Sequence, residues 1–178
     1  MKILLFGVSN VGKTAVSHAL SEEIDYAFYD LDKLIIRKYG SIKKFQKKYP
    51  DQKERDAVRL NLVKEVLSKE RDCVIAMSPV AYLEGYDAIF HSSDTICIEL
   101  YDTSENIFKR LVFMDDKGNV LHVPDTYLQK NRMQYIRQID DDLNYFHSLY
   151  KKHMNVIHMN GLDINGVIEK IINELGNV

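Results

Sequence analysis

Residues 7–14 read Gly7-Val8-Ser9-Asn10-Val11-Gly12-Lys13-Thr14, and this stretch matches the phosphate-binding pattern G-x-x-x-x-G-K-[ST] at every fixed position. A short apolar run, residues 3–6, precedes it as a buried parallel strand would, and apolar residues at helical spacing follow it. A strand, a glycine-containing loop and a helix in this order surround an anion with backbone N–H groups and the positive end of a helix dipole. The stretch therefore predicts a binding site for a nucleoside triphosphate.

The pattern also assigns tasks to the residues of this phosphate loop. Lys13 is expected to neutralise β- and γ-phosphate oxygens, and the Thr14 hydroxyl is expected to hold Mg²⁺. The other expected contacts to the nucleotide phosphates come from Gly7, Ser9, Asn10, Val11, Gly12 and Ala15.

The composition is that of a globular protein. Hydrophobic residues make up 46% of the 178 residues and charged residues 28%, which excludes a disordered or collagen-like chain. This length suits one compact unit, so we expect a single domain over residues 1–178. The net charge of −2 provides no global basic field, which argues against nucleic acid as the main partner.

The expected compartment is the cytoplasm. Cys73 and Cys97 lie far apart in apolar runs without C-x-x-C spacing, which favours buried free thiols and a reducing compartment. The first expected strand begins at the N-terminus and leaves no room for a signal peptide. No apolar run approaches the length of a membrane span.

Apolar runs typical of buried strands alternate with amphipathic helical stretches along the chain. This alternation, with the phosphate loop, predicts an α/β protein with the three-layer P-loop NTPase fold: a five-stranded parallel sheet, helices on both faces and a lid segment. The expected strands cover residues 3–6, 26–29, 73–77, 95–100 and 155–159, and the main helices after the first cover 31–39, 41–48, 52–69, 126–152 and 163–175.

Two carboxylates follow the second expected strand, in the sequence Asp30-Leu31-Asp32. Ligands of open α/β sheets collect at the carboxyl ends of the strands, and residues two apart on an extended segment point the same way. One carboxylate is therefore expected in the Mg²⁺ shell with Thr14, and the other as acceptor of a proton or hydrogen bond from a substrate hydroxyl. The alternative is that Asp30 only caps the following helix.

An irregular polar segment over about residues 114–126 is expected to close as a lid over the transferring phosphate. It is acidic, so basic residues nearby would have to neutralise the developing charge. The alternative is a surface loop without a catalytic part. The candidate basic residues are Lys109, Arg110, Lys117, Lys130, Arg132 and Arg137.

Basic residues are concentrated between Lys33 and Arg55, where only Asp51 and Glu54 oppose them. We expect this part of the chain, about residues 31–60, to form the acceptor-binding region, and a positive patch there would attract an anionic acceptor. The alternative is a solvated helix face.

The phosphate loop, the Asp30-Leu31-Asp32 pair, and Gly40-Ser41-Ile42 ahead of the aromatic Phe45 resemble the shikimate kinases. More broadly they resemble the nucleoside-monophosphate-kinase-like P-loop kinases. The spacing from Thr14 to Asp30 agrees with that family, and the likeness covers essentially the whole chain.

The resemblance implies ATP as the phosphoryl donor and implies roles for individual residues. It places Asp30 in the Mg²⁺ shell, Asp32 at the acceptor hydroxyl and Arg55 at an acceptor carboxylate. It also places Arg110 against the adenine, and Asn160 in the adenine-contacting loop. The alternatives are a solvated charge for Arg55 and a complement of a helix dipole for Arg110. The predicted catalytic residues are thus Lys13, Asp32 and Arg55.

The chain departs from the family pattern on the acceptor side and in the lid. Ser78-Pro79-Val80 stands where the family has three glycines, and a proline there removes a backbone donor. His122-Val-Pro124 replaces an Arg-Pro pair, and Phe146 stands where a substrate arginine is expected. Arg132 or Arg137 could take over from an earlier turn of that helix.

The resulting hypothesis is a small-molecule kinase, monomeric or homodimeric, that transfers the γ-phosphoryl group of ATP to a hydroxyl of a small anionic metabolite. One alternative is a nucleoside or nucleotide kinase in which Tyr39, Phe45 and Tyr49 stack on a base. Another is an ATP-binding regulatory protein without turnover. A GTPase is disfavoured, because the D-x-x-G letters of residues 115–118 follow a helix and no N-K-x-D comes after them.

Overall fold

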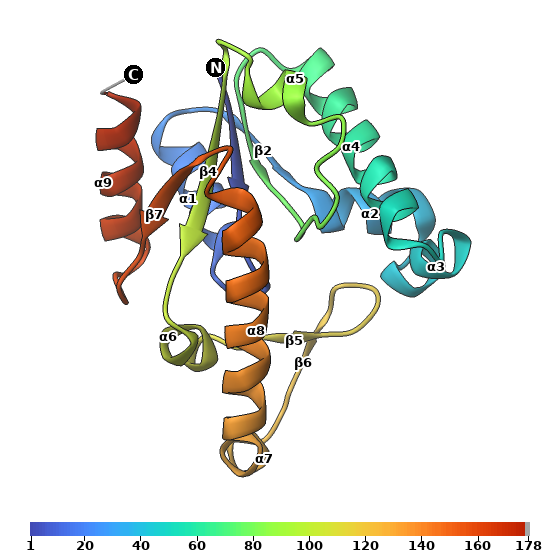
Figure 1. The fold of residues 1–178 in the computed structure, drawn as a ribbon, viewed down its shortest axis with the longest axis vertical. Coiled ribbons are helices and arrows are strands. Elements are labelled where there is room, and N and C mark those ends of the chain that lie inside the picture. The colour runs from blue at the N-terminus through green and yellow to red at the C-terminus, as the bar shows by residue number, and fades with distance from the viewer. Residues whose placement is uncertain (177–178) are drawn as a thin grey trace.

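A five-stranded parallel sheet forms the centre of the protein, as the computed structural model shows for residues 1–176 (Figure 1). Its strands lie in the order β2-β3-β1-β4-β7, so β1 lies at the centre of the sheet, between β3 and β4. The predicted α/β P-loop fold is confirmed. The strands are β1 (Lys2–Phe6), β2 (Ala27–Asp30), β3 (Cys73–Ala76), β4 (Thr95–Tyr101) and β7 (Asn155–His158).

Helices cover both faces of this sheet, and alternate side chains of β1 point into the two cores that lie between the sheet and these helices. Ile3 and Leu5 belong to a core with α1 and α9, while Leu4 and Phe6 belong to a core with α4 and the end of α8. All four of these side chains are fully buried. The helices are α1 (Lys13–Glu23), α2 (Leu31–Tyr39), α3 (Ile42–Lys48), α4 (Gln52–Lys69), α5 (Asp87–Phe90), α6 (Ser104–Lys109), α7 (Asp125–Lys130), α8 (Arg132–Tyr150) and α9 (Ile164–Leu175).

The long helix expected over 126–152 is wrong as a single helix, because it is divided at Asn131 into α7 and α8. The Asn131 amide group donates to the Tyr127 carbonyl and so ends α7 with a local side-chain bond. No helix within residues 1–176 combines the length and the apolar character needed to cross a bilayer.

The segment expected to be an irregular lid is a short antiparallel hairpin of β5 (Phe113–Met114) and β6 (Val120–Leu121). Asp115 builds its turn by accepting hydrogen bonds from the backbone N–H groups of Lys117 and Asn119, at 2.8 and 2.9 Å. The tip lies against the start of α3, because the Ile42 N–H donates to the Asp116 carbonyl at 2.8 Å.

Two buried side chains hold the segment that follows β3. The Tyr150 hydroxyl, at the end of α8, accepts from the Val80 N–H at 2.8 Å and donates to the Val80 carbonyl at 2.9 Å. The Asp56 carboxylate, on α4, accepts from the N–H groups of Ala81 and Tyr82 at 2.9 and 3.0 Å. The backbone of residues 80–82 is therefore fixed by side chains of α4 and α8, whereas a glycine-rich segment would be more mobile.

Both cysteines are buried and free, in agreement with the prediction. Burial is the main factor that raises the pKa of Cys73 to about 11 and that of Cys97 to about 12. Because the reactive form of cysteine is the thiolate, both are expected to be inert at neutral pH.

We expect Tyr150→Phe to lower the free energy of unfolding by about 1–3 kcal/mol, because the variant leaves both backbone groups of Val80 buried without their partner. Urea unfolding followed by circular dichroism measures this loss. The matched control is Tyr145→Phe on the same helix, where the ring is exposed. Equal stability of the two variants would contradict the assignment.

Candidate active site at the carboxyl ends of the strands

The phosphate loop curls between β1 and α1 through backbone that only some residues adopt. Gly7, Asn10 and Gly12 have φ values of 135°, 60° and 113°. A Cβ atom on Gly7 would lie 2.6 Å from the Leu100 carbonyl oxygen, so this position has no room for a side chain. Among the described residues no side chain caps α1, which leaves its first N–H groups available for an anion.

The Lys13 ammonium is turned into this loop. Its Nζ donates to the carbonyl oxygens of Gly7 and Val8, at 2.9 and 2.6 Å, and the residue is only 8% exposed. Burial lowers the pKa of Lys13 to about 8, and the nearby carboxylates of Asp32 and Asp30 oppose this shift. A bound polyphosphate would supply the anionic partner that this buried cation otherwise lacks.

Asp30 caps α2 and contacts Thr14 at the same time, so the cap does not turn its carboxylate away from the phosphate loop. One carboxylate oxygen accepts from the Thr14 hydroxyl at 2.8 Å, and the other accepts from the Lys33 N–H at 3.0 Å and caps α2. A hydroxyl and a carboxylate side by side are the oxygen donors that Mg²⁺ prefers, so these two residues fit that ion.

Asp32 lies in the first turn of α2 and is joined to the end of β3. Its Oδ1 accepts a hydrogen bond of 2.5 Å from the hydroxyl of Ser78, which is 3% exposed. The segment that replaces the family's glycines thus contributes a hydroxyl group to the site. The sequence analysis gave Ser78 no role, although a serine directly after a buried strand was the available signal.

Arg55 lies where the sequence placed it on α4, but its guanidinium serves the preceding turn. It donates to the carbonyls of Tyr49 and Pro50, at 2.9 and 2.5 Å, and to the Gln52 side chain at 2.6 Å. Within the described residues, the donors of this guanidinium are directed at local groups and none is bonded to Asp32.

A second arginine of α4 was missed by the sequence analysis. Arg59 forms an ion pair of 2.6 Å with the fully buried Asp56, and its guanidinium lies 5.5 Å from the centre of the Phe45 ring. Its Nε is buried and has no partner among the described residues. An i, i+3 pair of opposite charges on a buried helix face was the sequence signal.

Asp102 gathers the residues expected at the adenine. This buried carboxylate accepts from the Arg110 guanidinium at 2.6 Å, from the Asn106 amide at 2.9 Å and from the Gly161 N–H at 3.3 Å. Burial by itself would raise the pKa of Asp102, but the hydrogen bonds from Asn106, Arg110 and the Thr103 N–H, together with the charge of Arg110, outweigh it and lower the pKa. The structure therefore brings Arg110 and the loop containing Asn160 together at the end of β4 and β7.

The basic candidates for the lid differ in their surroundings. Arg132 pairs with Glu105 and lies over the Phe108 ring at 5.7 Å. Within residues 1–176, Lys117, Lys130 and Arg137 form no ion pair. Lys109 forms none there either, so these four residues remain the candidates that are free to contact an incoming phosphate.

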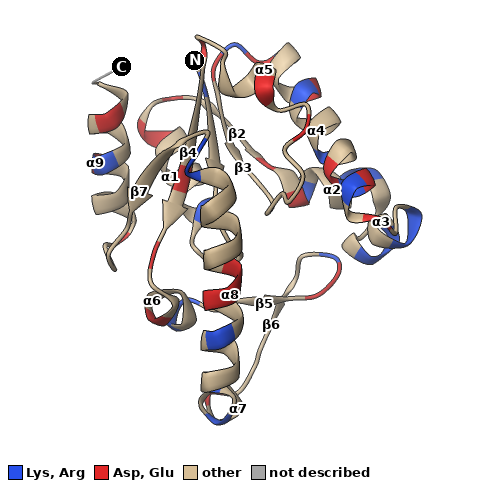
Figure 2. Ribbon diagram, in the orientation of Figure 1, with Lys and Arg blue, Asp and Glu red and all other residues tan. Residues whose placement is uncertain are grey.

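The three aromatic rings proposed to stack on a base pack on one another instead. The ring centre of Phe45 lies 5.2 Å from that of Tyr39 and 5.6 Å from that of Tyr49, and Phe45 is fully buried. Basic side chains are concentrated on neighbouring α3, which Figure 2 shows as a largely blue helix.

A family model described as "Shikimate kinase" matches residues 9–175. The chain belongs to the shikimate kinase family. None of the curated proteins matches it in sequence.

Solved structures of two shikimate kinases and of a gluconokinase share the fold. Shikimate kinase from Aquifex aeolicus has a TM-score of 0.70 at 20% identity, covering 99% of this chain and 96% of that one. Shikimate kinase from Acinetobacter baumannii in complex with shikimate has a TM-score of 0.66 at 22% identity, covering 99% and 93%. A gluconokinase from Sinorhizobium meliloti has a TM-score of 0.60 at 16% identity, covering 99% and 91%.

The lowered pKa of Lys13 predicts that stability increases with pH in the absence of nucleotide. Between pH 8 and 10.5 the unfolded chain holds more protons at this lysine than the folded chain, so the free energy of unfolding rises. We expect the wild type to gain stability over Lys13→Met across this range, as measured by urea unfolding at each pH.

Using the difference between the two proteins removes other alkaline titrations. Tyrosines with raised pKa values, such as Tyr39 at about 12, titrate with the opposite sign and are present in both proteins. If the difference in the free energy of unfolding between wild type and Lys13→Met stays constant from pH 8 to 10.5, the folded protein does not lower the pKa of Lys13, and the prediction is wrong.

Proposed function

We propose that this shikimate kinase family member transfers the γ-phosphoryl group of ATP to a hydroxyl of a small anionic metabolite. One observation carries the proposal: Lys13, Thr14–Asp30 and Asp32–Ser78 meet at the carboxyl ends of β1, β2 and β3. The first two groups suit a triphosphate and its metal, and the third suits a hydroxyl. Family membership supports a P-loop small-molecule kinase.

The nucleotide side of the proposed site consists of fixed donors. The N–H groups of the loop and of α1 bind the phosphates, and Lys13 leaves the carbonyls of Gly7 and Val8 to neutralise β- and γ-phosphate oxygens. Arg110, held by Asp102, provides a planar guanidinium on which the adenine can stack, and Asn160 borders the same place.

Mg²⁺ is the metal that the family and the donor set imply. Thr14 and Asp30 would hold it, because their oxygens already lie 2.8 Å apart and Asp30 keeps its cap with the other oxygen. When bound, the ion neutralises charge on the phosphate oxygens.

Asp32 is the proposed base on the acceptor side. Because the Ser78 hydroxyl occupies Oδ1, the second oxygen of the carboxylate is the one that can accept the acceptor's hydroxyl proton. The hydrogen bond also fixes the plane of the carboxylate, which contributes to catalysis by positioning.

Arg59 is a second proposed contact of the acceptor, beside the predicted Arg55. Its side chain is largely buried, one face of the guanidinium lies on Phe45, and its Nε has no hydrogen-bond partner within residues 1–176. An acceptor carboxylate or phosphate would satisfy that donor, whereas Arg55 would have to give up its carbonyl partners first.

The decisive experiment is an ATP-consumption assay with shikimate, gluconate and nucleoside monophosphates as separate acceptors. We expect turnover with a non-nucleotide acid. Lys13→Ala should abolish it, and Asp32→Asn should reduce kcat by about 10²–10⁴-fold while leaving the KM for ATP unchanged.

Other outcomes of this assay overturn parts of the proposal. Turnover with a nucleotide only would support the nucleotide-kinase alternative, which the mutual packing of Tyr39, Phe45 and Tyr49 disfavours. ATP binding with no transfer to any acceptor, and equal ATP affinity in Asp32→Asn, would support the regulatory alternative. Activity retained in Lys13→Ala would remove the mechanism.

The two arginines of α4 are separated by paired variants. We expect Arg59→Gln to raise the acceptor KM by about 10- to 100-fold, the value of one charge-assisted hydrogen bond, with little change in the KM for ATP. Arg55→Gln should change the acceptor KM by less than about 3-fold, because its donors serve local carbonyls. Steady-state kinetics with the acceptor that the wild type uses provides the measurement.

Arg59→Lys controls for a loss of folding, because it keeps a cation beside Asp56 and removes the planar donor fork. A raised acceptor KM in Arg55→Gln but not in Arg59→Gln would return the role to Arg55, as the sequence predicts.

A further inference from the structure

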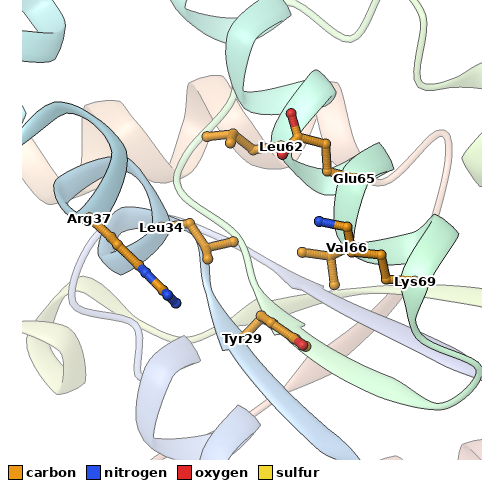
Figure 3. A pocket seen from close by; sticks show the side chains of 7 residues that line it. All are labelled: Tyr29, Leu34, Arg37, Leu62, Glu65, Val66 and Lys69. Atoms are coloured by element: carbon orange, nitrogen blue, oxygen red, sulfur yellow. The ribbon is translucent and has the colours of Figure 1, made fainter.

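A second pocket lies on the opposite face of β2 from the phosphate loop. Asp30 and Phe28 face α1, where they contact Thr14 and His18. Tyr29 lies between them on the extended strand, so its side chain leaves the other face of the sheet. There its ring lines a pocket of about 240 Å³ between α2 and α4, at the edge of the sheet (Figure 3).

The walls of this β2-edge pocket are apolar. Leu34 of α2 faces Leu62 and Val66 of α4, and the Tyr29 ring closes the side at the sheet. Leu62 and Val66 are 5% and 7% exposed, so they form a floor of hydrocarbon instead of a rim. Such walls favour an apolar group as the occupant.

The charges at the rim are unbalanced. Glu65 is paired with Lys38 at 3.4 Å, and Glu70 accepts the Tyr29 hydroxyl at 2.5 Å, so both nearby carboxylates are engaged. Arg37 and Lys69 also line the pocket. Within residues 1–176 the side chain of neither residue forms an ion pair or a hydrogen bond.

The two free cations approach the pocket from different helices. Figure 3 shows the Lys69 side chain reaching from α4 across Val66 toward Leu34, with Arg37 on the other side of Leu34. An anionic group between the helices would have both cations within its field, and Arg37 adds a planar donor fork suited to a carboxylate.

We propose that the β2-edge pocket binds a small amphipathic carboxylate, one ring or branched hydrocarbon bearing a single carboxylate group. The hydrocarbon lies on Leu34, Leu62 and Val66, and the carboxylate lies between Arg37 and Lys69. The size fits, because a cavity of about 150 Å³ holds benzene and the remaining space accommodates a carboxylate.

The position of the pocket gives the ligand a route to the acceptor side of the catalytic site. The helix α2 begins next to Asp30 and carries Asp32 in its first turn, and α4 carries Arg59. Binding itself is independent of the proposed function.

The test uses the full chain and benzoate as the probe, with benzamide as its neutral counterpart and acetate as the counterpart without a ring. We expect benzoate to shift backbone amide signals of α2 and α4 in ¹⁵N-resolved NMR spectra, with a dissociation constant on the order of 1 mM. Benzamide and acetate should bind at least about 10-fold more weakly.

A charge-matched pair of double variants locates the carboxylate. Arg37→Gln with Lys69→Gln should weaken benzoate at least about 10-fold, while Lys33→Gln with Lys64→Gln, which removes two exposed cations of the same helices, should not. All four positions are exposed, so the fold is expected to survive in both.

Three results would overturn the assignment: no saturable shift up to about 20 mM benzoate, equal weakening in the two double variants, or shifts confined to the phosphate loop. None of them bears on phosphoryl transfer, which the acceptor assay decides separately.

Discussion

The site depends on a buried ammonium group whose hydrogen bonds, among the residues that the structure describes, go to backbone carbonyls. Lys13 is 8% exposed and donates to Gly7 and Val8, two residues of the loop that it serves. The loop can curl this tightly because Gly7 approaches the Leu100 carbonyl more closely than any side chain would permit. The desolvation cost of this cation is present before any ligand arrives. A polyphosphate therefore enters a site that is already electrostatically incomplete.

The acceptor side follows a different principle from the phosphate side. Ser78-Pro79-Val80 provides none of the flexibility of a glycine triplet, and the segment is held from beneath by Tyr150 and Asp56. The wall beside Asp32 is therefore rigid, with a single serine hydroxyl directed at the carboxylate. Selectivity at such a wall comes from a fixed fit, since little backbone adjustment is possible.

The sequence was sufficient where a local rule determines the structure. The phosphate loop and the strand run follow from residue type and spacing and lie as predicted, and the cap by Asp30 is the alternative that residue type offered. Contacts between segments that are distant in the sequence could not be predicted from it. Ser78 meets Asp32 across 46 positions, and Tyr150 meets Val80 across 70, and no periodicity records such pairs.

The arginines show the same limit on a smaller scale. Arg55 and Arg59 are one turn apart on α4, and the resemblance to the shikimate kinases implied a role for the first. The turn before α4 presents free carbonyls that take up the Arg55 guanidinium, and Asp56 draws Arg59 inward. Which of two neighbouring cations faces inward therefore depends on the partner beside each: the carbonyls before α4 for Arg55, and the buried Asp56 for Arg59.

One hydrogen bond between the tip of the β5–β6 hairpin and α3 is made by main-chain atoms alone, from the Ile42 N–H to the Asp116 carbonyl. Its energy does not depend on which side chains the tip carries. Natural variants could therefore change most of residues 116–119 without loosening the hairpin from α3. Gly118 is the exception, because its φ is 81° and a Cβ atom there would lie 3.2 Å from Ile36. Substitutions can thus change the charge of the hairpin tip with little effect on the position of the hairpin.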